Sequence, residues 1–328
     1  MHRMTLTPLL ELRDLRKTYR LPRGRVLRAV DGLSLRVLPG ETLGLVGESG
    51  CGKSTLGRCM LRLADPSSGQ ILFEGRDITT LPERRLRALR PLMQMVFQDS
   101  SAALNPRRRI GDLLAEPLRV HPAPDGRRRP ASVIAARLSE LMDLVGLPVQ
   151  ALERYPHEFS GGQRQRINIA RALALTPRLV VADEPVSALD VSVQAQIVNL
   201  FADLRRELGL TYVFIAHDLA VVRQISSRVA VMYLGAIVEL GETDGVLHHP
   251  AHPYTAALTA AVPRAVVGHP HAPVLRGDAP SPTAPRTGCR FHARCPQAQA
   301  RCAQEEPALH TLRPGHAVAC HFPLPPGP

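Results

Sequence analysis

Residues 47–54 read Gly47-Glu-Ser-Gly-Cys-Gly-Lys-Ser54 and fit the pattern G-x-x-x-x-G-K-[ST]. This stretch follows an apolar run, Thr42–Val46, that is typical of a buried strand, and it precedes a segment that can form a helix from Lys53. Glycines let consecutive backbone N–H groups curl around phosphate oxygens, and a helix N-terminus favours negative charge. The stretch therefore predicts a site for the phosphates of a nucleotide.

Within this loop, Lys53 can reach the β- and γ-phosphates, and the hydroxyl of Ser54 can bind Mg²⁺. Only two of the 41 basic residues are lysines, Lys17 and Lys53, so a chance match to the pattern is rare. For Cys51 two interpretations stay open. The loop and the helix dipole could lower its pKa, or it is a small residue tolerated at a variable position. The expected phosphate cradle consists of Gly47, Glu48, Ser49, Gly50, Cys51, Gly52, Lys53, Ser54 and Thr55.

The composition excludes several classes of protein. Hydrophobic residues make up 45% of the 328 residues, which argues against global disorder. No uncharged apolar run reaches about 18 residues, and the first 20 residues lack an apolar leader, so we expect neither a spanning segment nor a secretory signal. The six cysteines are then expected to stay reduced in the cytoplasm. The net charge of +12 suggests nucleic acid, an anionic membrane face or nucleotides as partners.

The first 247 residues show alternating strand and helix patterns, which predict an α/β sheet with ligands at the carboxyl ends of its strands. Short apolar runs at Leu179–Ala182 and Tyr212–Ala216 are typical of buried parallel strands. Val191–Leu208 has helical spacing and ends at a glycine. Two further helices are expected at Ile110–Leu118 and Ser132–Val145, separated by a solvated loop.

Two more segments carry polar side chains at positions that suit chemistry. The run Leu179–Glu184 is a strand that ends in two acids, of which Asp183 suits Mg²⁺ and Glu184 suits a base that polarises water. Phe159-Ser-Gly-Gly-Gln163 precedes an arginine-rich helix, Arg164–Leu175, that Ser160 can cap. That cap forms a second anion site, which one nucleotide on one subunit does not require.

Together these residues resemble the nucleotide-binding subunit of an ABC transporter, over roughly residues 11–245. Gly47–Thr55 resembles the Walker A motif, Leu179–Glu184 the Walker B motif, and Phe159–Gln163 the signature motif, with Phe where the family usually has Leu. The resemblance implies a P-loop ATPase cassette with a RecA-like α/β core, an antiparallel β subdomain and an α-helical signature subdomain. It also implies ATP and Mg²⁺ as ligands, and a head-to-tail dimer in which one subunit's signature closes over the other's phosphate loop.

The resemblance implies further residue roles. Tyr19 would stack on adenine, Gln98 is the Q-loop glutamine, His217 is the switch histidine and Asp190 ends the D-loop Ser187–Asp190. The implied catalytic residues are Lys53, Gln98, Glu184 and His217. The implied Mg²⁺ ligands are Ser54, Gln98 and Asp183. The implied signature residues are Ser160, Gly161, Gly162 and Gln163.

Three stretches resemble the dipeptide and oligopeptide importer branch: Phe97–Pro106, Tyr155–Ile167 and Glu184–Gln196. The last looks more like the second ("F") of the two ATPases in such importers. Nickel and other small-solute importers share much of the pattern, so the solute stays open. The resemblance implies two membrane-spanning permeases, a second ATPase and indirectly an extracytoplasmic solute-binding protein as partners. It places the chain peripherally at the cytoplasmic face of the inner membrane.

The expected division is a nucleotide-binding domain at residues 9–247 and a C-terminal extension at 248–328. The extension holds 15 of the 30 prolines and 9 of the 13 histidines. We expect its histidines to be solvated and one helix, Tyr254–Val262, to form. The extension also holds four cysteines, at 289, 295, 302 and 320, whose thiols suit zinc or an iron–sulfur cluster. The spacing between the first two is long for zinc, and thiols without metal are a third possibility. The importer branch implies a [4Fe–4S] cluster on Cys289, Cys295, Cys302 and Cys320.

Three rival classes are weaker. A soluble ABC ATPase acting on nucleic acid or ribosomes would fit the charge, but such proteins tend to carry two cassettes or long coiled-coil insertions. A regulator that only binds ATP does not need Glu184 and His217. An exporter usually fuses its cassette to spanning helices. We therefore expect an ATPase that drives import and does not bind nucleic acid.

Overall fold

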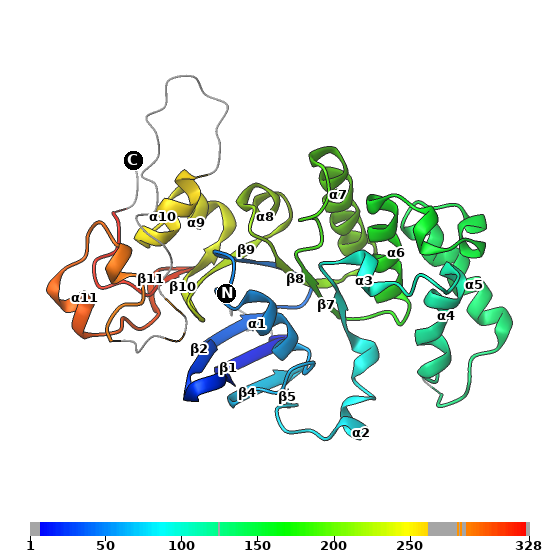
Figure 1. Cartoon of the computed structure of the whole chain (residues 1–328), viewed down its shortest axis with the longest axis horizontal. Helices are drawn as coiled ribbons and strands as arrows, with labels where there is room; N and C mark the ends of the chain where they lie inside the picture. Colours follow the sequence, from blue (N-terminus) through cyan, green and yellow to red (C-terminus); the bar gives the residue numbers. More distant parts are fainter. Residues whose placement is uncertain (1–6, 124, 262–280, 282, 284–286, 326–328) are drawn as a thin grey trace, which may run out of the picture. The chain divides into compact units, whose positions relative to one another are not determined.

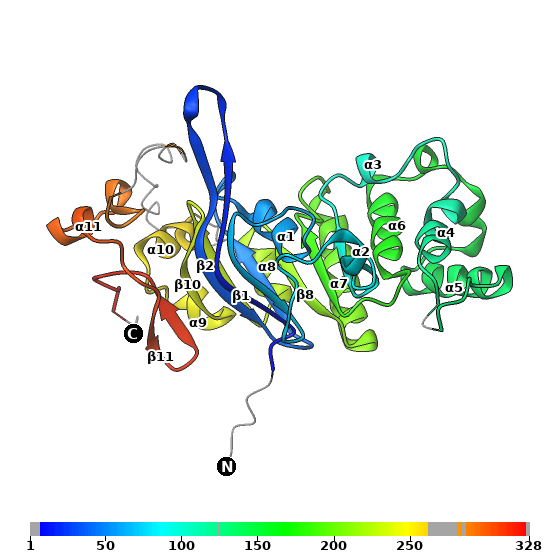
Figure 2. The same cartoon turned by 90° about the horizontal axis from the view of Figure 1, so that it is seen from below.

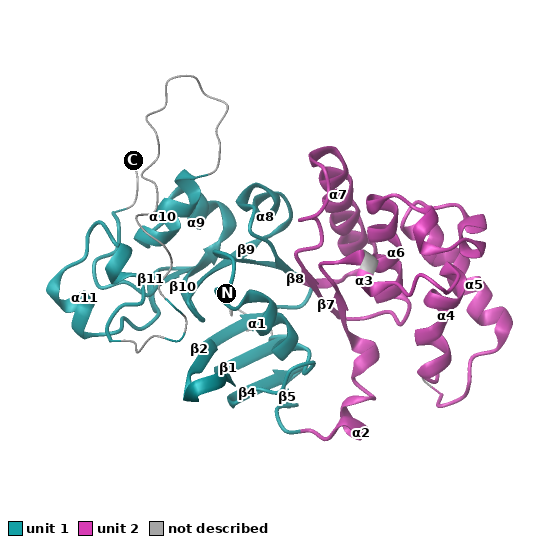
Figure 3. Cartoon of the chain, in the orientation of Figure 1, with its two compact units in different colours: residues 1–80, 214–328 teal, residues 81–213 magenta. Residues whose placement is uncertain are grey.

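The computed structural model describes residues 7–123, 125–261, 281, 283 and 287–325. Figure 1 shows the helices and strands in chain order, and Figure 3 colours the two compact units that they form. Unit 1 comprises residues 1–80 and 214–328, and unit 2 comprises residues 81–213. Within the described ranges, every helix falls short of the combined length and hydropathy that a bilayer crossing requires.

Unit 1 contains an antiparallel sheet with the strand order β2-β1-β4-β5. The strands are β1 Leu10–Arg20, β2 Val26–Val37, β4 Ser68–Phe73 and β5 Arg76–Asp77. β1 and β2 form a long hairpin, with Leu10 opposite Val37 at one end and Arg20 opposite Val26 at the other (Figure 2). Along the end of β2, buried apolar and exposed polar residues alternate, as in a strand with one face on the core. The hairpin holds Tyr19 near its turn.

Five strands of unit 1 follow one another in a second sheet, in the order β11-β12-β10-β9-β3. They are β3 Thr42–Val46, β9 Arg228–Tyr233, β10 Ala236–Glu242, β11 His310–Arg313 and β12 His316–Val318. β3 runs parallel to β9, and the other pairs are antiparallel. All five residues of β3 are buried, because a strand covered on both faces has no solvated side.

The helices of unit 1 include the one that the phosphate loop predicts. They are α1 Lys53–Met60, α8 Leu219–Ile225, α9 Thr243–His248, α10 Pro253–Ala260 and α11 Ala300–Gln304. The order β3, loop, α1 confirms the strand–loop–helix prediction. The helix expected at Tyr254–Val262 is present as α10, and Val262 lies outside the described residues.

Unit 2 pairs two parallel strands, β6 Met93–Val96 and β7 Leu179–Asp183, and is otherwise mostly helical. Its helices are α2 Glu83–Leu86, α3 Ser100–Ala103, α4 Ile110–Val120, α5 Ala131–Leu144, α6 Gly161–Leu173 and α7 Val191–Leu208. β8 Thr211–Ile215 spans the residue at which the chain returns to unit 1. The strands and helices expected at 110–118, 132–145, 179–182, 191–208 and 212–216 are thus confirmed to within two residues.

One predicted helix start needs correction. The arginine-rich helix expected from Arg164 begins three residues earlier, at Gly161. The reason is a capping box, in which the Ser160 hydroxyl accepts from Gln163 N and the Gln163 side chain accepts from Ser160 N. The two glycines therefore form the first turn of α6 instead of a flexible turn before it.

The prediction that the histidines of the extension are solvated is wrong for two of them. His252 is 1% exposed and His316 is 4% exposed. Both contact Glu239 of β10. The Glu239 carboxylate accepts from His316 Nε2 at 2.6 Å and from the backbone N–H of His252 at 2.9 Å. A buried carboxylate needs such partners, so the extension supplies them. Burial also lowers the pKa of His252 to about 4.

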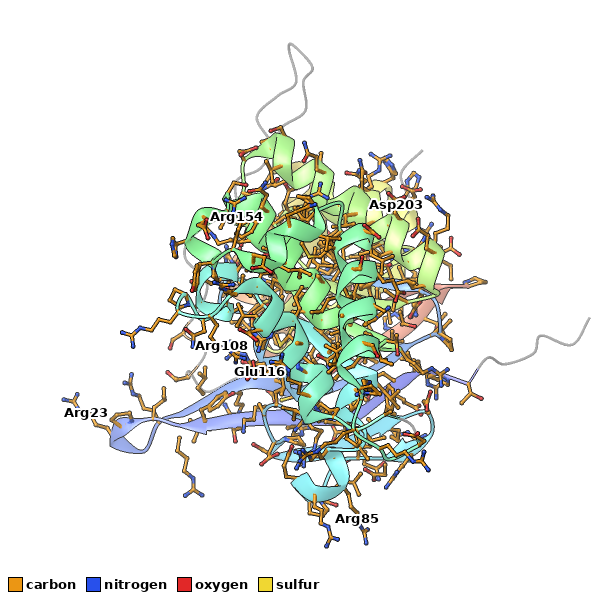
Figure 4. All side chains as sticks on the ribbon, turned by 90° about the vertical axis from the view of Figure 1, so that its right-hand side faces the viewer. Arg23, Arg85, Arg108, Glu116, Arg154 and Asp203 are labelled. Atoms are coloured by element: carbon orange, nitrogen blue, oxygen red, sulfur yellow. The ribbon has the colours of Figure 1, made fainter. Side chains whose placement is uncertain are left out.

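The arginine surplus is partly neutralised by neighbouring acids. In unit 2, Arg108 Nη1 lies 2.9 Å from Glu116 Oε1, and Figure 4 shows the two side chains close together. Other arginines extend from the ribbon, such as Arg23 at the tip of the β1–β2 hairpin and Arg85 on α2 (Figure 4). The charge is therefore spread over many elements of both units.

Candidate nucleotide site

The phosphate loop connects the end of β3 to the start of α1 and is shaped by its glycines. Gly47, Gly50 and Gly52 have φ values of 152°, 79° and 107°. A Cβ on Gly47 would lie 2.1 Å from Met232 O, and one on Gly52 would lie 2.0 Å from Ala29 O. These two positions therefore need glycine for space as well as for backbone conformation.

The Lys53 ammonium group is directed back into the loop. Its side chain is buried, and Nζ donates to Gly47 O at 2.7 Å and to Glu48 O at 3.0 Å. Ser54 and Thr55 follow in the first turn of α1, at the positive end of the helix dipole. A cation and a helix N-terminus thus meet in one loop, which is the arrangement expected for phosphate binding.

The suggestion of a lowered Cys51 pKa is wrong. Cys51 is 5% exposed, and burial raises its pKa above the usual value for a thiol, while Lys53 only partly opposes this effect. A buried thiol of this kind acts as a small packing residue. The backbone of Cys51 helps to hold the loop, because its carbonyl accepts a hydrogen bond from Gly235 N at 2.9 Å.

Two more predicted residues lie in unit 1. Tyr19 is 37% exposed, and Lys17 Nζ lies 4.9 Å from the centre of its ring. An exposed aromatic face can stack on a base. His217 is exposed and lies two residues beyond the end of β8, where Asp218 caps α8 by accepting from Ala220 N.

Unit 2 brings two predicted residues into direct contact. Gln98 Nε2 donates to Glu184 Oε2 at 3.1 Å, although the residues are 86 positions apart. Asp183 is buried at the end of β7, and Glu184 follows with a φ of 45°. This left-handed conformation costs a non-glycine residue about 1–3 kcal/mol, and such strain is concentrated at functional sites.

The signature and D-loop residues each form the N-terminus of a helix in unit 2. Ser160 caps α6, and a Cβ on Gly162 would lie 2.5 Å from Val193 Cγ1 of α7, so this glycine keeps the two helices close. Asp190 caps α7, and its carboxylate accepts from Ser192 Oγ at 2.7 Å and from Val193 N at 3.0 Å. These bonds lower the pKa of Asp190.

Contacts to Glu48 are the feature that the sequence analysis missed. Its carboxylate binds Arg294, and its backbone N–H donates to the Tyr254 hydroxyl. Tyr254 lies in the first turn of α10, and no motif marks Arg294. The distances in sequence, 206 and 246 residues, explain why no local pattern could reveal these contacts.

The four cysteines of the extension line one small cavity, together with His252, Phe291 and Phe322. All six cysteines of the chain are free of disulfides. Burial raises the pKa of Cys320 to about 11. Among the described residues, no three histidine, cysteine or acidic side chains are arranged to hold a metal ion. Four thiols are thus a suitable set of metal ligands chemically, but their side chains are not arranged around a common point as metal ligands are.

The fold and these loops define an ABC transporter ATPase. Residues 30–187 match the family described as ABC transporter, and residues 238–302 match the oligopeptide/dipeptide transporter C-terminal region. The chain is 51% identical to the oligopeptide transport ATP-binding protein AppF of Bacillus subtilis, over 96% of this chain and 97% of that one. It is 50% identical to the probable peptide ABC transporter ATP-binding protein y4tS of Sinorhizobium fredii, over 97% and 90%. The chain therefore belongs to the ABC transporter family, among its ATP-binding subunits.

Solved structures agree with this assignment. A dimeric ATP-binding cassette in a post-hydrolysis state, bound to ADP and Pi, matches with a TM-score of 0.64 and 27% identity, covering 71% of this chain and 98% of that one. The protein cbiO1 of Clostridium perfringens, part of the ABC transporter complex cbiONQ, matches with a TM-score of 0.65 and 26% identity, covering 74% and 91%.

Proposed function

We propose that this chain is the ATP-hydrolysing subunit of an importer for dipeptides or oligopeptides. The observation that supports the proposal is similarity over nearly the whole chain, at 51% and 49% identity, to proteins named for oligopeptide transport and peptide import. That similarity extends into the C-terminal region, whose family is named for oligopeptide and dipeptide transport. The cassette domain is proposed at residues 9–247 and the extension at 248–328.

In the proposed mechanism, the loop from Gly47 to Thr55 binds the β- and γ-phosphates, and Lys53 stabilises the charge that develops in phosphoryl transfer. Tyr19 stacks on the adenine. Ser54, Gln98 and Asp183 are the side chains that would hold Mg²⁺, whose charge neutralises the phosphate oxygens when it is bound.

Glu184 is the proposed base for the attacking water. Its contact with Gln98 supports this role, because the amide N–H holds the carboxylate in place just beyond the end of β7. His217 is proposed to complete the site by holding the γ-phosphate or the water. After hydrolysis the lost γ-phosphate contacts allow the subunits to separate.

We propose a head-to-tail dimer, in which Ser160, Gly161, Gly162, Gln163 and Asp190 face the phosphates bound by a partner ATPase. The capped N-terminus of α6 supports this proposal, because its dipole favours an anion. The partner is proposed to be a second ATPase chain at the cytoplasmic face of the inner membrane. Two permeases would receive the motion, and a solute-binding protein would deliver the peptide.

Uptake by cells tests this function. Cells that lack this gene should take up radiolabelled di- and tetrapeptides only when the wild-type chain is restored, and the Glu184→Gln chain should fail to restore uptake. Nickel uptake, measured in parallel, should not depend on the chain. Restored nickel uptake without restored peptide uptake would contradict the peptide assignment and leave the ATPase intact.

We also propose that Cys289, Cys295, Cys302 and Cys320 ligate a [4Fe–4S] cluster. Their common cavity and their thiol chemistry support this, and binding a cluster would require the four side chains to shift from their present arrangement. Anaerobically purified protein is expected to be brown and to contain about four iron atoms per chain. Colourless, iron-free protein would refute the cluster, and stoichiometric zinc would favour the alternative metal.

A further inference from the structure

Glu48, the acidic residue of the phosphate loop, is held at three points. Its backbone N–H donates to Tyr254 Oη at 2.8 Å, and its carbonyl accepts from Lys53 Nζ at 3.0 Å. Its carboxylate forms a two-pronged ion pair with Arg294, with Nη1–Oε2 at 2.9 Å and Nη2–Oε1 at 3.0 Å. Tyr254 and Arg294, hereafter the Glu48 brace, both come from the C-terminal segment beyond residue 248.

The Glu48 brace is itself firmly packed. The Arg294 side chain is 7% exposed, and its Nη1 also lies 3.3 Å from Tyr233 Oη. The rings of Tyr233, Tyr254 and Phe291 pack against one another, with centroids 4.6–5.4 Å apart. The Glu48 side chain is 24% exposed, so the pair is partly buried, and its two parallel bonds restrict both side chains to few rotamers.

A second arginine anchors the same turn of chain. Arg290 Nη1 donates to Leu234 O at 2.8 Å, and its Nη2 lies 3.2 Å from Asp31 Oδ2. Arg290 and Arg294 are the two arginines between Cys289 and Cys295, so the segment that links two of the four thiols is bound to β2 and to the turn after β9. Through Tyr254 and Arg294, the extension also contacts Glu48, the residue next to Gly47.

The Glu48 brace has an electrostatic consequence for nucleotide binding. An ionised carboxylate in a phosphate loop would repel the charges of ATP, since like charges at close range disfavour each other. Arg294 neutralises that carboxylate, and the Tyr254 hydroxyl accepts from the Glu48 N–H. Both the carboxylate and the N–H of Glu48 are thus engaged within the protein before a nucleotide binds.

We propose that Tyr254 and Arg294 are positioning residues for ATP, through which the C-terminal extension sets the nucleotide affinity of the cassette. They act through Glu48 and touch no phosphate themselves. The inference rests on ATP binding at this loop and does not depend on which solute is transported.

The test measures the dissociation constants of ATP, ADP and adenosine on the full-length chain and its variants. Arg294→Ala is expected to weaken ATP binding about tenfold, because Glu48 is left unpaired in the loop. The effect should be smaller for ADP, which carries less charge, and absent for adenosine. Tyr254→Phe, which removes one hydroxyl, should weaken ATP binding by about two- to fourfold.

The double variant distinguishes positioning from a merely structural role. Adding Glu48→Gln to Arg294→Ala removes the unpaired charge, so ATP affinity should return to about that of Glu48→Gln alone. Arg294→Lys keeps the positive charge but cannot form the two-pronged ion pair with Glu48, so its affinity for ATP should be intermediate. Arg301→Ala is the matched control, because this exposed arginine of the extension forms an ion pair with the exposed Glu305, and ATP affinity should stay unchanged.

Wild-type ATP affinity in both Arg294→Ala and Tyr254→Phe would overturn the proposal. Equal losses of affinity for ATP, ADP and adenosine would also overturn it. So would purely additive effects of Arg294→Ala and Glu48→Gln in the double variant. If Arg294→Ala does not fold, Arg294→Lys and Tyr254→Phe decide the question by the same comparison of nucleotides. Failure of the wild-type chain to bind ATP would instead refute the nucleotide site itself.

Discussion

Replacing Glu184 with glutamine is expected to lower the rate of ATP hydrolysis by about 10²–10⁴-fold while ATP still binds. The amide has the shape of the carboxylate but cannot take a proton from water. Gln98 Nε2, now 3.1 Å from the carboxylate, would still find an oxygen acceptor, so the local structure should persist. Phosphate release and the dissociation constant of ATP are the two quantities to measure.

The same variant should accumulate as a dimer in the presence of ATP, because the closed dimer opens only after its ATP is hydrolysed. Size-exclusion chromatography with and without ATP would detect this. Glu207→Gln is the matched control, since it neutralises an exposed acid on α7 and should change the rate by less than about twofold. Hydrolysis at the wild-type rate in Glu184→Gln would exclude Glu184 as the base.

Replacing Lys53 with alanine is expected to weaken ATP binding by about 10–100-fold, because a charge-assisted contact to phosphate is lost. The hydrolysis rate at saturating ATP should fall by a further ~10²–10³-fold, since the ammonium stabilises developing charge. The buried position of Lys53 and its bonds to Gly47 O and Glu48 O place this charge in the loop before any nucleotide arrives.

Arg58→Ala is a suitable control for Lys53, because it removes an exposed cation from the last turn of the same helix. ATP affinity should be unchanged in that variant. Lys53→Arg should not restore function, since the larger, planar guanidinium has a different shape from an ammonium in a buried position. Unchanged ATP affinity in Lys53→Ala would show that the loop binds phosphate through its backbone alone.

The local features of this chain could be predicted from its sequence. The strand Thr42–Val46, the helix from Lys53 and the helix Val191–Leu208 all follow from apolar spacing and from glycines at their ends. The capping role of Ser160 also follows from residue type and position. Such features depend on neighbours a few residues away, so the sequence contains the necessary information.

Features that depend on burial or on distant contacts could not be predicted. The pKa of Cys51 rises because the fold removes water from it, whereas the local motif alone suggested the opposite. His252 and His316 are buried beside Glu239, which accepts from the His252 backbone N–H and from the His316 ring. The contact of Arg294 with Glu48 joins residues 246 positions apart. Only the folded chain reveals such partners.

The pairing of β12 with β10 has a consequence for the exposed edge of the second sheet. Without β12, β10 would present unpaired backbone groups along one edge, and such an edge can recruit a strand from another molecule. The matched cassette structures span only 71% and 74% of this chain, so much of it has no counterpart in them. A cassette that lacks a strand equivalent to β12 must protect the same edge by charge, by proline or by a covering loop. In this protein, β12 both pairs with β10 and supplies His316 as a hydrogen-bond donor for Glu239, and the edge of the sheet passes to β11, a strand of only four residues.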